Sequence, residues 1–271
     1  MSHKNNIQVS VVIPTYNRAS YLKVTLDSVL RQTFHNFEII VVDDGSTDNT
    51  QDFLSSITDE RLRVLTNVKN LGIQKSLNKA VANAKGKYIA RIDDQDEWID
   101  PEKLAKQVNF LKTNQEYVLV GTGVVMVDTA GYEVQRYLLP SSDEQIRSNL
   151  LGKNLFIHPS VVFRKDIFDL VGGYSESEDM RHIEDGDLWL KLGTRGKLHN
   201  LPLFAVRYVI DPSSVSNKNR LVQMRKNDLL ISKYRKQYPG YWRARLRHLV
   251  RMIVYGYLRM SFVSKLTAAI K

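Results

Sequence analysis

Short apolar runs alternate with segments of helical periodicity through the first hundred residues. The runs at residues 9–14, 37–42 and 88–92 are typical of strands buried on both faces of a sheet. Between them, apolar residues recur every three or four positions in residues 20–32 and 73–84, which predicts two helices. Such alternation with short loops predicts an α/β fold, a mostly parallel sheet flanked by helices.

The pattern changes in the second half of the chain. Residues 118–127 and 132–138 predict a β-hairpin, and residues 154–164 predict a further strand. Ser142 is placed to cap a helix that runs to residue 151.

Acidic residues follow the predicted strand at 88–92 directly, as Asp93, Asp94 and Asp96. Ligands of parallel sheets bind at the carboxyl ends of the strands, and carboxylates this close repel each other. A divalent cation with oxygen ligands, such as Mg²⁺, is therefore expected among them. The alternative is a solvated acidic turn before a helix that Pro101 opens.

Two other strand ends carry polar residues, at positions 14–17 and at Asp43 and Asp44. Carboxylates at neighbouring strand ends suit the ribose hydroxyls and the metal-bound diphosphate of a nucleotide. The first strand is not followed by G-x-G-x-x-G, and G-x-x-x-x-G-K-[ST] occurs nowhere in the sequence. The sequence therefore argues against a dinucleotide site and a P-loop.

The segments VVIPTYNRASYLKVTLDSVLRQTFHNFEIIVVDDGSTDNT and NLGIQKSLNKAVANAKGKYIARIDDQDEW resemble family 2 glycosyltransferases of the GT-A fold, of the inverting, bacterial surface-polysaccharide type. The similarity covers roughly residues 7–215. It implies a metal-dependent hexosyltransferase that uses Mg²⁺ or Mn²⁺. The enzyme would move a sugar from a nucleoside diphosphate, most commonly UDP in this family, to a hydroxyl of a glycan or lipid-linked acceptor in cell-surface polysaccharide synthesis.

The resemblance also implies roles for single residues. Donor contacts are expected from Pro14, Thr15, Tyr16, Asn17, Asp43, Asp44, Arg91, Asp93 and Asp94. Asp96 aligns best with the last aspartate of the DXD-type motif and is the first candidate for the metal, with Asp94 second. Gln95 departs from the pattern, since many relatives have an acid there. Arg91 fits equally well as a structural ion-pair partner of a neighbouring aspartate.

An acidic pair, Glu184 and Asp185, opens a predicted amphipathic helix. Acids at a helix N-terminus can simply interact with the helix dipole. The resemblance instead assigns these two residues to catalysis, with Asp185 as the base that takes the proton of the acceptor hydroxyl. His158 and Trp189 are candidate acceptor contacts, although a hydrogen-bonded structural histidine is the alternative for His158.

The net charge of +10 is unevenly distributed. Residues 218–271 hold fourteen Lys or Arg and one acid, a net +13, while residues 1–217 carry −3. We therefore expect a glycosyltransferase domain at 1–217, with its donor half at about 1–115 and its acceptor half at about 116–217, followed by a basic helical C-terminal tail at 218–271. If the tail is not part of the core, a variant ending near residue 217 should stay soluble.

Within the tail, apolar residues and arginines form separate stripes between Trp242 and residue 262. Such a helix either docks on the protein or lies on an anionic membrane. No cysteine, no apolar signal core and no run of 18 apolar residues are present, so we expect a cytoplasmic protein bound peripherally to the inner membrane face. A nucleotidyltransferase and a basic-tailed nucleic-acid-binding protein with a degenerate enzyme domain are the alternatives, although no nucleic-acid partner is expected.

Overall fold

The computed structural model describes residues 7–211 and 219–269 of the chain. The first half contains β1 (Val9–Thr15), α1 (Ala19–Leu30), β2 (Phe37–Asp43), α2 (Thr50–Ser55), β3 (Leu62–Thr66), α3 (Ile73–Ala82), β4 (Tyr88–Arg91), β5 (Glu97–Trp98) and α4 (Lys103–Thr113). The second half contains β6 (Tyr117–Val127), β7 (Glu133–Tyr137), α5 (Asp143–Leu150), β8 (Val162–Arg164), α6 (Lys165–Leu170), α7 (Glu184–Gly193), β9 (Lys197–Val209), α9 (Arg220–Lys233) and α10 (Tyr241–Ala269). Two short 3-10 turns, η1 (His158–Ser160) and η2 (Glu178–Met180), complete the order.

The strands form one sheet in the order β3-β2-β1-β4-β8-β6-β9-β5, with β7 paired to β6. Strands β3, β2, β1 and β4 are mutually parallel, and every antiparallel pair includes a strand of the second half. The predicted α/β fold is therefore confirmed. The carboxyl ends of β1, β2 and β4 meet at one edge, where the polar loops were expected to come together.

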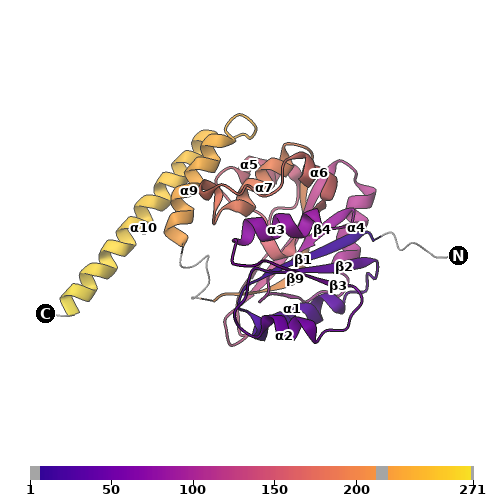
Figure 1. The fold of residues 1–271 in the computed structure, drawn as a ribbon. Coiled ribbons are helices and arrows are strands. Elements are labelled where there is room, and N and C mark those ends of the chain that lie inside the picture. The colour runs from indigo at the N-terminus through magenta and orange to yellow at the C-terminus, as the bar shows by residue number, and fades with distance from the viewer. Residues whose placement is uncertain (1–6, 212–218, 270–271) are drawn as a thin grey trace.

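Alternate residues of each central strand enter different cores. Val11 and Ile39 pack on one face of the sheet with residues of α1, α2 and α4, whereas Val12 and Ile40 pack on the other with residues of α3, α5, α6 and α7. Figure 1 shows α1 and α2 below the sheet and α3, α5, α6 and α7 above it. Because both faces are covered, these strands are mostly apolar, as their sequences predicted, although Ser10 and Glu38 are buried among the apolar residues.

Several local predictions are confirmed. The hairpin forms, because β7 pairs with β6 antiparallel. Ser142 caps α5, and its Oγ accepts a hydrogen bond of 3.3 Å from Gln145 N. Helix α4, however, begins at Lys103, two residues after Pro101. The strand predicted at residues 154–164 is wrong over most of its length, since only its last three residues are extended in β8 and residues 158–160 form η1. Pro159 cannot donate to a strand ladder, which favours the turn.

The basic segment divides into a docked part and a projecting part. Leu230, Ile231, Tyr234, Tyr238 and Ala244 are all buried in the same core as α7. The first part of the segment is therefore not an appendage, and the condition for a stable variant ending near residue 217 is not met. Beyond it, α10 runs away from the body of the protein (Figure 1).

Asp187 of α7 fixes α9 through polar contacts. Its Oδ1 accepts hydrogen bonds from Lys233 Nζ at 2.7 Å and from the Tyr234 hydroxyl at 2.8 Å. The Tyr238 hydroxyl donates to Leu190 O at 2.8 Å. Within the described part of the chain, no helix is both long and apolar enough to cross a membrane.

Candidate active site

A cavity of about 800 Å³ opens at the carboxyl ends of β1, β2 and β4 and reaches the first turn of α7 and one side of α9. Its wall brings together most of the residues that the sequence singled out: Pro14, Thr15, Tyr16, Asp44, Arg91, Asp93, Asp94, His158, Glu184 and Asp185. Expected donor contacts and the expected base therefore face the same space, although more than ninety residues separate Arg91 from Asp185.

Asn17, which is exposed, and Asp43, which is buried, are not among the residues that line the cavity, and both hold the loop after β2. Asn17, at φ 56°, uses its Oδ1 to accept hydrogen bonds from Thr47 N at 2.7 Å and Asp48 N at 3.3 Å. The fully buried Asp43 accepts from Ser46 N at 2.9 Å and Gln51 Nε2 at 3.0 Å. These hydrogen bonds give both side chains a structural role, and their expected contacts with the donor stay a prediction.

Asp44 faces the cavity but also has a structural role. Its carboxylate accepts hydrogen bonds from Asn67 Nδ2 at 2.7 Å and from the backbone N–H groups of Leu71 and Gly72, both at 2.9 Å. It thereby holds the loop before α3 against the end of β2. This loop forms part of the cavity wall at Asn70 and Gly72.

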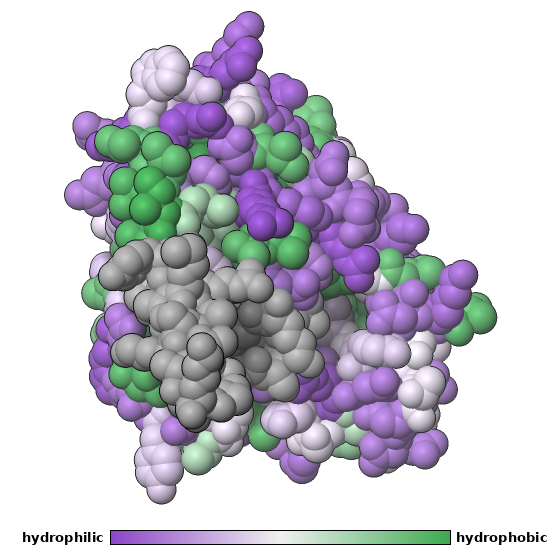
Figure 2. All heavy atoms as spheres, turned by 90° about the vertical axis from the view of Figure 1, so that its left-hand side faces the viewer, coloured by the Kyte–Doolittle hydropathy of each residue, from purple (hydrophilic) through white to green (hydrophobic). Residues whose placement is uncertain are grey.

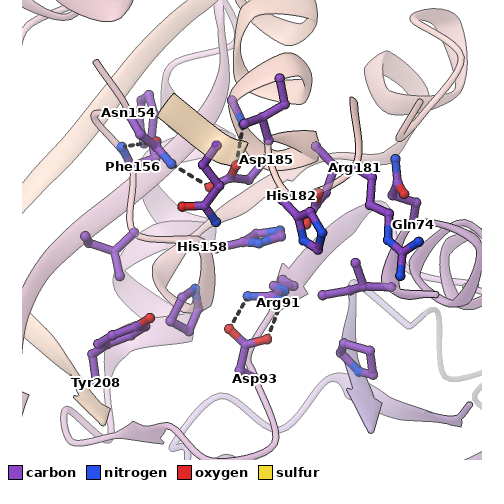
Figure 3. Close-up of a pocket in the computed structure, with 18 of the residues that line it drawn as sticks. Gln74, Arg91, Asp93, Asn154, Phe156, His158, Arg181, His182, Asp185 and Tyr208 are labelled. Atoms are coloured by element: carbon purple, nitrogen blue, oxygen red, sulfur yellow. Dashed lines mark hydrogen bonds and ion pairs between the residues drawn. The ribbon is translucent and has the colours of Figure 1, made fainter. Parts of the chain in front are cut away.

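Arg91 places a buried cation under the cavity. Its guanidinium binds Asp93 through two hydrogen bonds, of which the one from Nη1 to Oδ2 measures 2.6 Å. Burial would lower the pKa of Arg91, but the Asp93 carboxylate holds that pKa above its ordinary value. Arg91 is therefore a structural ion-pair partner of Asp93 that also lines the cavity, and its contact with the donor stays a prediction. Figure 3 shows this ion pair beneath the His158 ring.

The other two aspartates of this loop differ in placement. Asp94 lines the cavity, and burial together with the neighbouring Asp93 carboxylate raises its pKa to about 6. Asp96 is fully buried behind the wall, where its Oδ1 accepts a hydrogen bond of 3.1 Å from Val209 N. Asp94 therefore faces the cavity and Asp96 does not, while the assignment of the metal ligand stays a prediction.

The residues present fit a divalent cation that is bound together with the donor. Among the residues that the structure describes, no group of three or more His, Cys, Asp or Glu is arranged to hold an ion. Mg²⁺ commonly needs only one or two carboxylates, with substrate phosphates and water as its other ligands. Asp94 and the amide oxygen of Gln95, both on the cavity wall, supply oxygen ligands of this kind.

Asp185 lies at the opposite end of the cavity, in the first turn of α7. Its Oδ1 accepts from Gly186 N at 2.7 Å and its Oδ2 from Asn154 Nδ2 at 2.5 Å, which fixes the carboxylate (Figure 3). Burial raises the pKa of Asp185 against these two hydrogen bonds. Burial and the Asp185 charge raise the pKa of Glu184 to about 7. A carboxylate with a raised pKa and a fixed orientation is suited to accept a proton.

His158 lines the cavity between its two ends. Trp189 lies behind the wall at this point. His158 Nε2 is 2.9 Å from the Tyr174 hydroxyl, and its ring contacts the Trp189 ring edge-on at 5.4 Å. Burial and the Arg91 charge hold the pKa of His158 well below its usual range, so the imidazole is neutral. Trp189 is fully buried, so its predicted contact with the acceptor is wrong. It supports His158 instead.

The cavity wall also contains residues that the sequence analysis did not propose as site residues. Arg181, His182, Tyr208, Gln223 and Asn227 all line the cavity. Tyr208 belongs to β9, a strand that was not predicted. Gln223 and Asn227 belong to α9, which was predicted only as part of a helical tail outside the domain. His182 has a φ of 74°, which turns the chain sharply just before α7. The only sequence feature that pointed to His182 was its position two residues before the acidic pair.

The model of the family described as "Glycosyl transferase family 2" matches residues 10–172. The chain belongs to this family. The match includes every strand end at the Arg91 side of the cavity, and it stops before Asp185. The resemblance found in the sequence is therefore confirmed, and it favours a glycosyltransferase over a nucleotidyltransferase or a nucleic-acid-binding protein.

The similarity of this glycosyltransferase to curated relatives continues beyond residue 172. The enzyme is 34% identical over 208 residues to the putative glycosyltransferase EpsE of Bacillus subtilis, covering 74% of this chain and 73% of that protein. It is 31% identical over 229 residues to the UDP-Glc:alpha-D-GlcNAc-diphosphoundecaprenol beta-1,3-glucosyltransferase WfaP of Escherichia coli, covering 83% and 86%.

Solved structures support the fold of the glycosyltransferase. TarS of S. aureus, residues 1–349 in complex with UDP, matches with a TM-score of 0.63 and 22% identity, over 83% of this chain and 65% of that one. The mannosyltransferase PcManGT of Pyrobaculum calidifontis, in complex with GDP-Man and Mn²⁺, matches with a TM-score of 0.65 and 18% identity, over 89% and 68%. The chain thus spans about two thirds of these two chains.

Proposed function

We propose that this enzyme is an inverting hexosyltransferase that moves a sugar from a nucleoside diphosphate sugar to a hydroxyl group. The observation that carries the proposal is the position of Asp185, whose fixed carboxylate faces the same cavity as Arg91 and Asp94. The donor phosphates then lie near Arg91 and Asp94, and the acceptor lies near α7.

The reaction is a single displacement at the anomeric carbon. Asp185 takes the proton of the acceptor hydroxyl, and the freed oxygen forms a bond to the anomeric carbon from the face opposite the diphosphate. The bond between that carbon and the diphosphate oxygen breaks, and its electron pair leaves with the diphosphate. A bound divalent cation would stabilise the charge on that leaving group. The guanidinium of Arg91, which is paired with Asp93, also lies at this end of the cavity.

The donor is proposed to be a UDP-sugar. The E. coli relative is named for UDP-Glc and the TarS structure contains UDP, whereas the PcManGT structure contains GDP-Man. Hydrolysis of a panel of UDP- and GDP-sugars, measured as release of nucleoside diphosphate with and without Mn²⁺, tests this proposal. Release from no sugar nucleotide in the panel would contradict it.

We propose that the acceptor is a glycan or a lipid-linked glycan used in surface polysaccharide synthesis, and that the enzyme works at the cytoplasmic face of the cell membrane. The supporting observation is the name of the E. coli relative, which gives a diphosphoundecaprenol-linked GlcNAc as the acceptor of that enzyme.

Removing the Asp94 carboxylate should weaken metal-dependent donor binding. We expect Asp94→Asn to raise the Mn²⁺ concentration needed for half-maximal donor hydrolysis at least tenfold, because a neutral amide is a weaker ligand for a hard cation. Asp96→Asn should leave that concentration unchanged and lower the thermal midpoint, because Asp96 lies behind the wall and binds Val209 N. The opposite pattern would restore Asp96 as the ligand.

The activity should rise with pH in the neutral range. Burial raises the pKa values of Asp185 and Glu184, and a base works only when it is ionised, so protonation at low pH removes activity. Arg91, His158 and Tyr174 also face these carboxylates. We expect kcat/KM of the wild type to increase through about pH 7, which is the value to which the pKa of Glu184 is raised.

Glu184→Gln provides the comparison, since it removes one of the two titrating groups. The rise in kcat/KM should move to lower pH in this variant. A profile unchanged by the substitution would show that Glu184 does not affect the ionisation of the base.

A further inference from the structure

Three arginines of α10 bind the body of the protein at and after α5. Arg243 donates to Ser148 O, Arg247 donates to Asn149 Oδ1 at 3.4 Å, and Arg251 donates to Gly152 O at 3.2 Å. These acceptors lie at the end of α5 and just beyond it. The arginine stripe seen in the sequence therefore attaches α10 to α5.

The apolar stripe of α10 consequently points away from the protein. Its members have exposed fractions between 49% and 79%: Trp242, Leu246, Leu249, Val250, Ile253 and Val254. An α-helix turns by about 100° per residue, so this stripe is centred opposite the buried Ala244. Figure 1 shows α10 leaving the body of the protein on the left-hand side of the view. Figure 2, in which that side faces the viewer, shows apolar residues gathered above the grey atoms.

We propose that this outward face, the six residues just named, inserts into the surface of an anionic lipid bilayer. An exposed apolar stripe on a basic helix is the pattern of helices that lie in the membrane interface. The hydrogen bonds of Arg243, Arg247 and Arg251 to neutral oxygens leave their positive charges uncompensated. Each basic residue near an anionic surface adds to the attraction.

The positive charge of the C-terminal segment favours an anionic bilayer over a second copy of the chain as the partner of the outward face. Residues 218–271 carry a net charge of +13, so two such segments packed face to face would repel each other. An anionic surface is attracted by the same charge. The protein's own core is not the partner of this face, because α10 is attached through its opposite side.

The bilayer-facing helix adjoins the acceptor end of the cavity. Asp228 of α9 forms an ion pair with Arg245 of α10. On the same helix α9, Gln223 and Asn227 line the cavity. Attachment through α10 would therefore place this end of the cavity near the membrane surface. The proposal concerns binding alone and does not depend on which sugar is transferred.

Vesicle sedimentation tests the proposal. The full-length protein should sediment with vesicles of phosphatidylglycerol and phosphatidylcholine at low salt, remain in the supernatant with phosphatidylcholine alone, and be released by high salt. The variant Leu246→Ser/Ile253→Ser should bind at least tenfold more weakly at unchanged charge. Both side chains are exposed, so the fold should be retained, which circular dichroism checks.

A matched control is Tyr132→Ser/Val134→Ser, which removes two exposed apolar side chains at the β7 hairpin. It should bind vesicles like the wild type. Equal sedimentation of the wild type with anionic and neutral vesicles, or undiminished binding of the α10 variant, would overturn the proposal. A dimer in light scattering that the α10 variant abolishes would assign the face to a second copy. Donor hydrolysis should be unchanged in both variants, which separates this test from that of the proposed function.

Discussion

Asp185→Asn should lower kcat by about 10²–10⁴-fold, the usual contribution of a positioned general base. Asparagine is nearly isosteric, and its one side-chain oxygen can keep the hydrogen bond from either Gly186 N or Asn154 Nδ2, but it cannot take the proton of the acceptor hydroxyl. Donor affinity should change little, because Asp185 lies at the end of the cavity remote from Asp94. Donor hydrolysis under saturating conditions and UDP binding by calorimetry measure the two quantities.

Asp52→Asn is the control, since this acid is exposed on α2, remote from the cavity. It should behave like the wild type. Loss of UDP binding by Asp185→Asn with kcat unchanged would show that Asp185 serves the donor and that another group is the base.

Truncation of the chain after residue 211 should prevent stable folding. It removes Leu230, Ile231, Tyr234 and Tyr238 from the main core. Burial of one large apolar side chain contributes about 1.5–3 kcal/mol. Loss of four such side chains approaches the whole stability of a typical domain, about 5–15 kcal/mol. Asp187 would also lose Lys233 and Tyr234 as partners.

Urea unfolding followed by tryptophan fluorescence measures the effect of this truncation. A second truncation after residue 255 keeps all the buried side chains named above and should retain the wild-type midpoint. A cooperative transition of the shorter chain at the wild-type midpoint would show that α9 is dispensable for the core.

The parallel half of the sheet was predictable because its strands are buried on both faces. A short apolar run such as residues 39–42 of β2, bounded by Glu38 and Asp43, is typical of a central strand of a parallel sheet. The strand β9 was not predictable from its pattern, because Asn200 and Pro202 interrupt its apolar residues. In α9, apolar side chains occur all around the helix, so no single stripe marks which side is buried.

The acidic loop shows why the site was only partly predictable. Spacing brings Asp93, Asp94 and Asp96 to the strand end, but it does not tell which carboxylate faces the cavity. That depends on partners distant in sequence, such as Val209 N for Asp96. The orientation of α10 was undetermined for the same reason, because the oxygens that bind its arginines come from α5 and the residues after it.

The end of the family match at residue 172 has a consequence for how such enzymes diversify. The strand ends near Arg91 precede that point, whereas Asp185, Tyr208 and Asn227 follow it. Exchange of the segment after residue 172 between relatives could therefore change the preference for the acceptor and leave the preference for the donor unchanged. Such chimeras would have to preserve α3, where Asn78 Nδ2 donates to Tyr174 O at 2.9 Å and Gln74 donates to Ser175 O. The side-chain amides of Gln74 and Asn78 thus mark the contact between the two segments that such chimeras would combine.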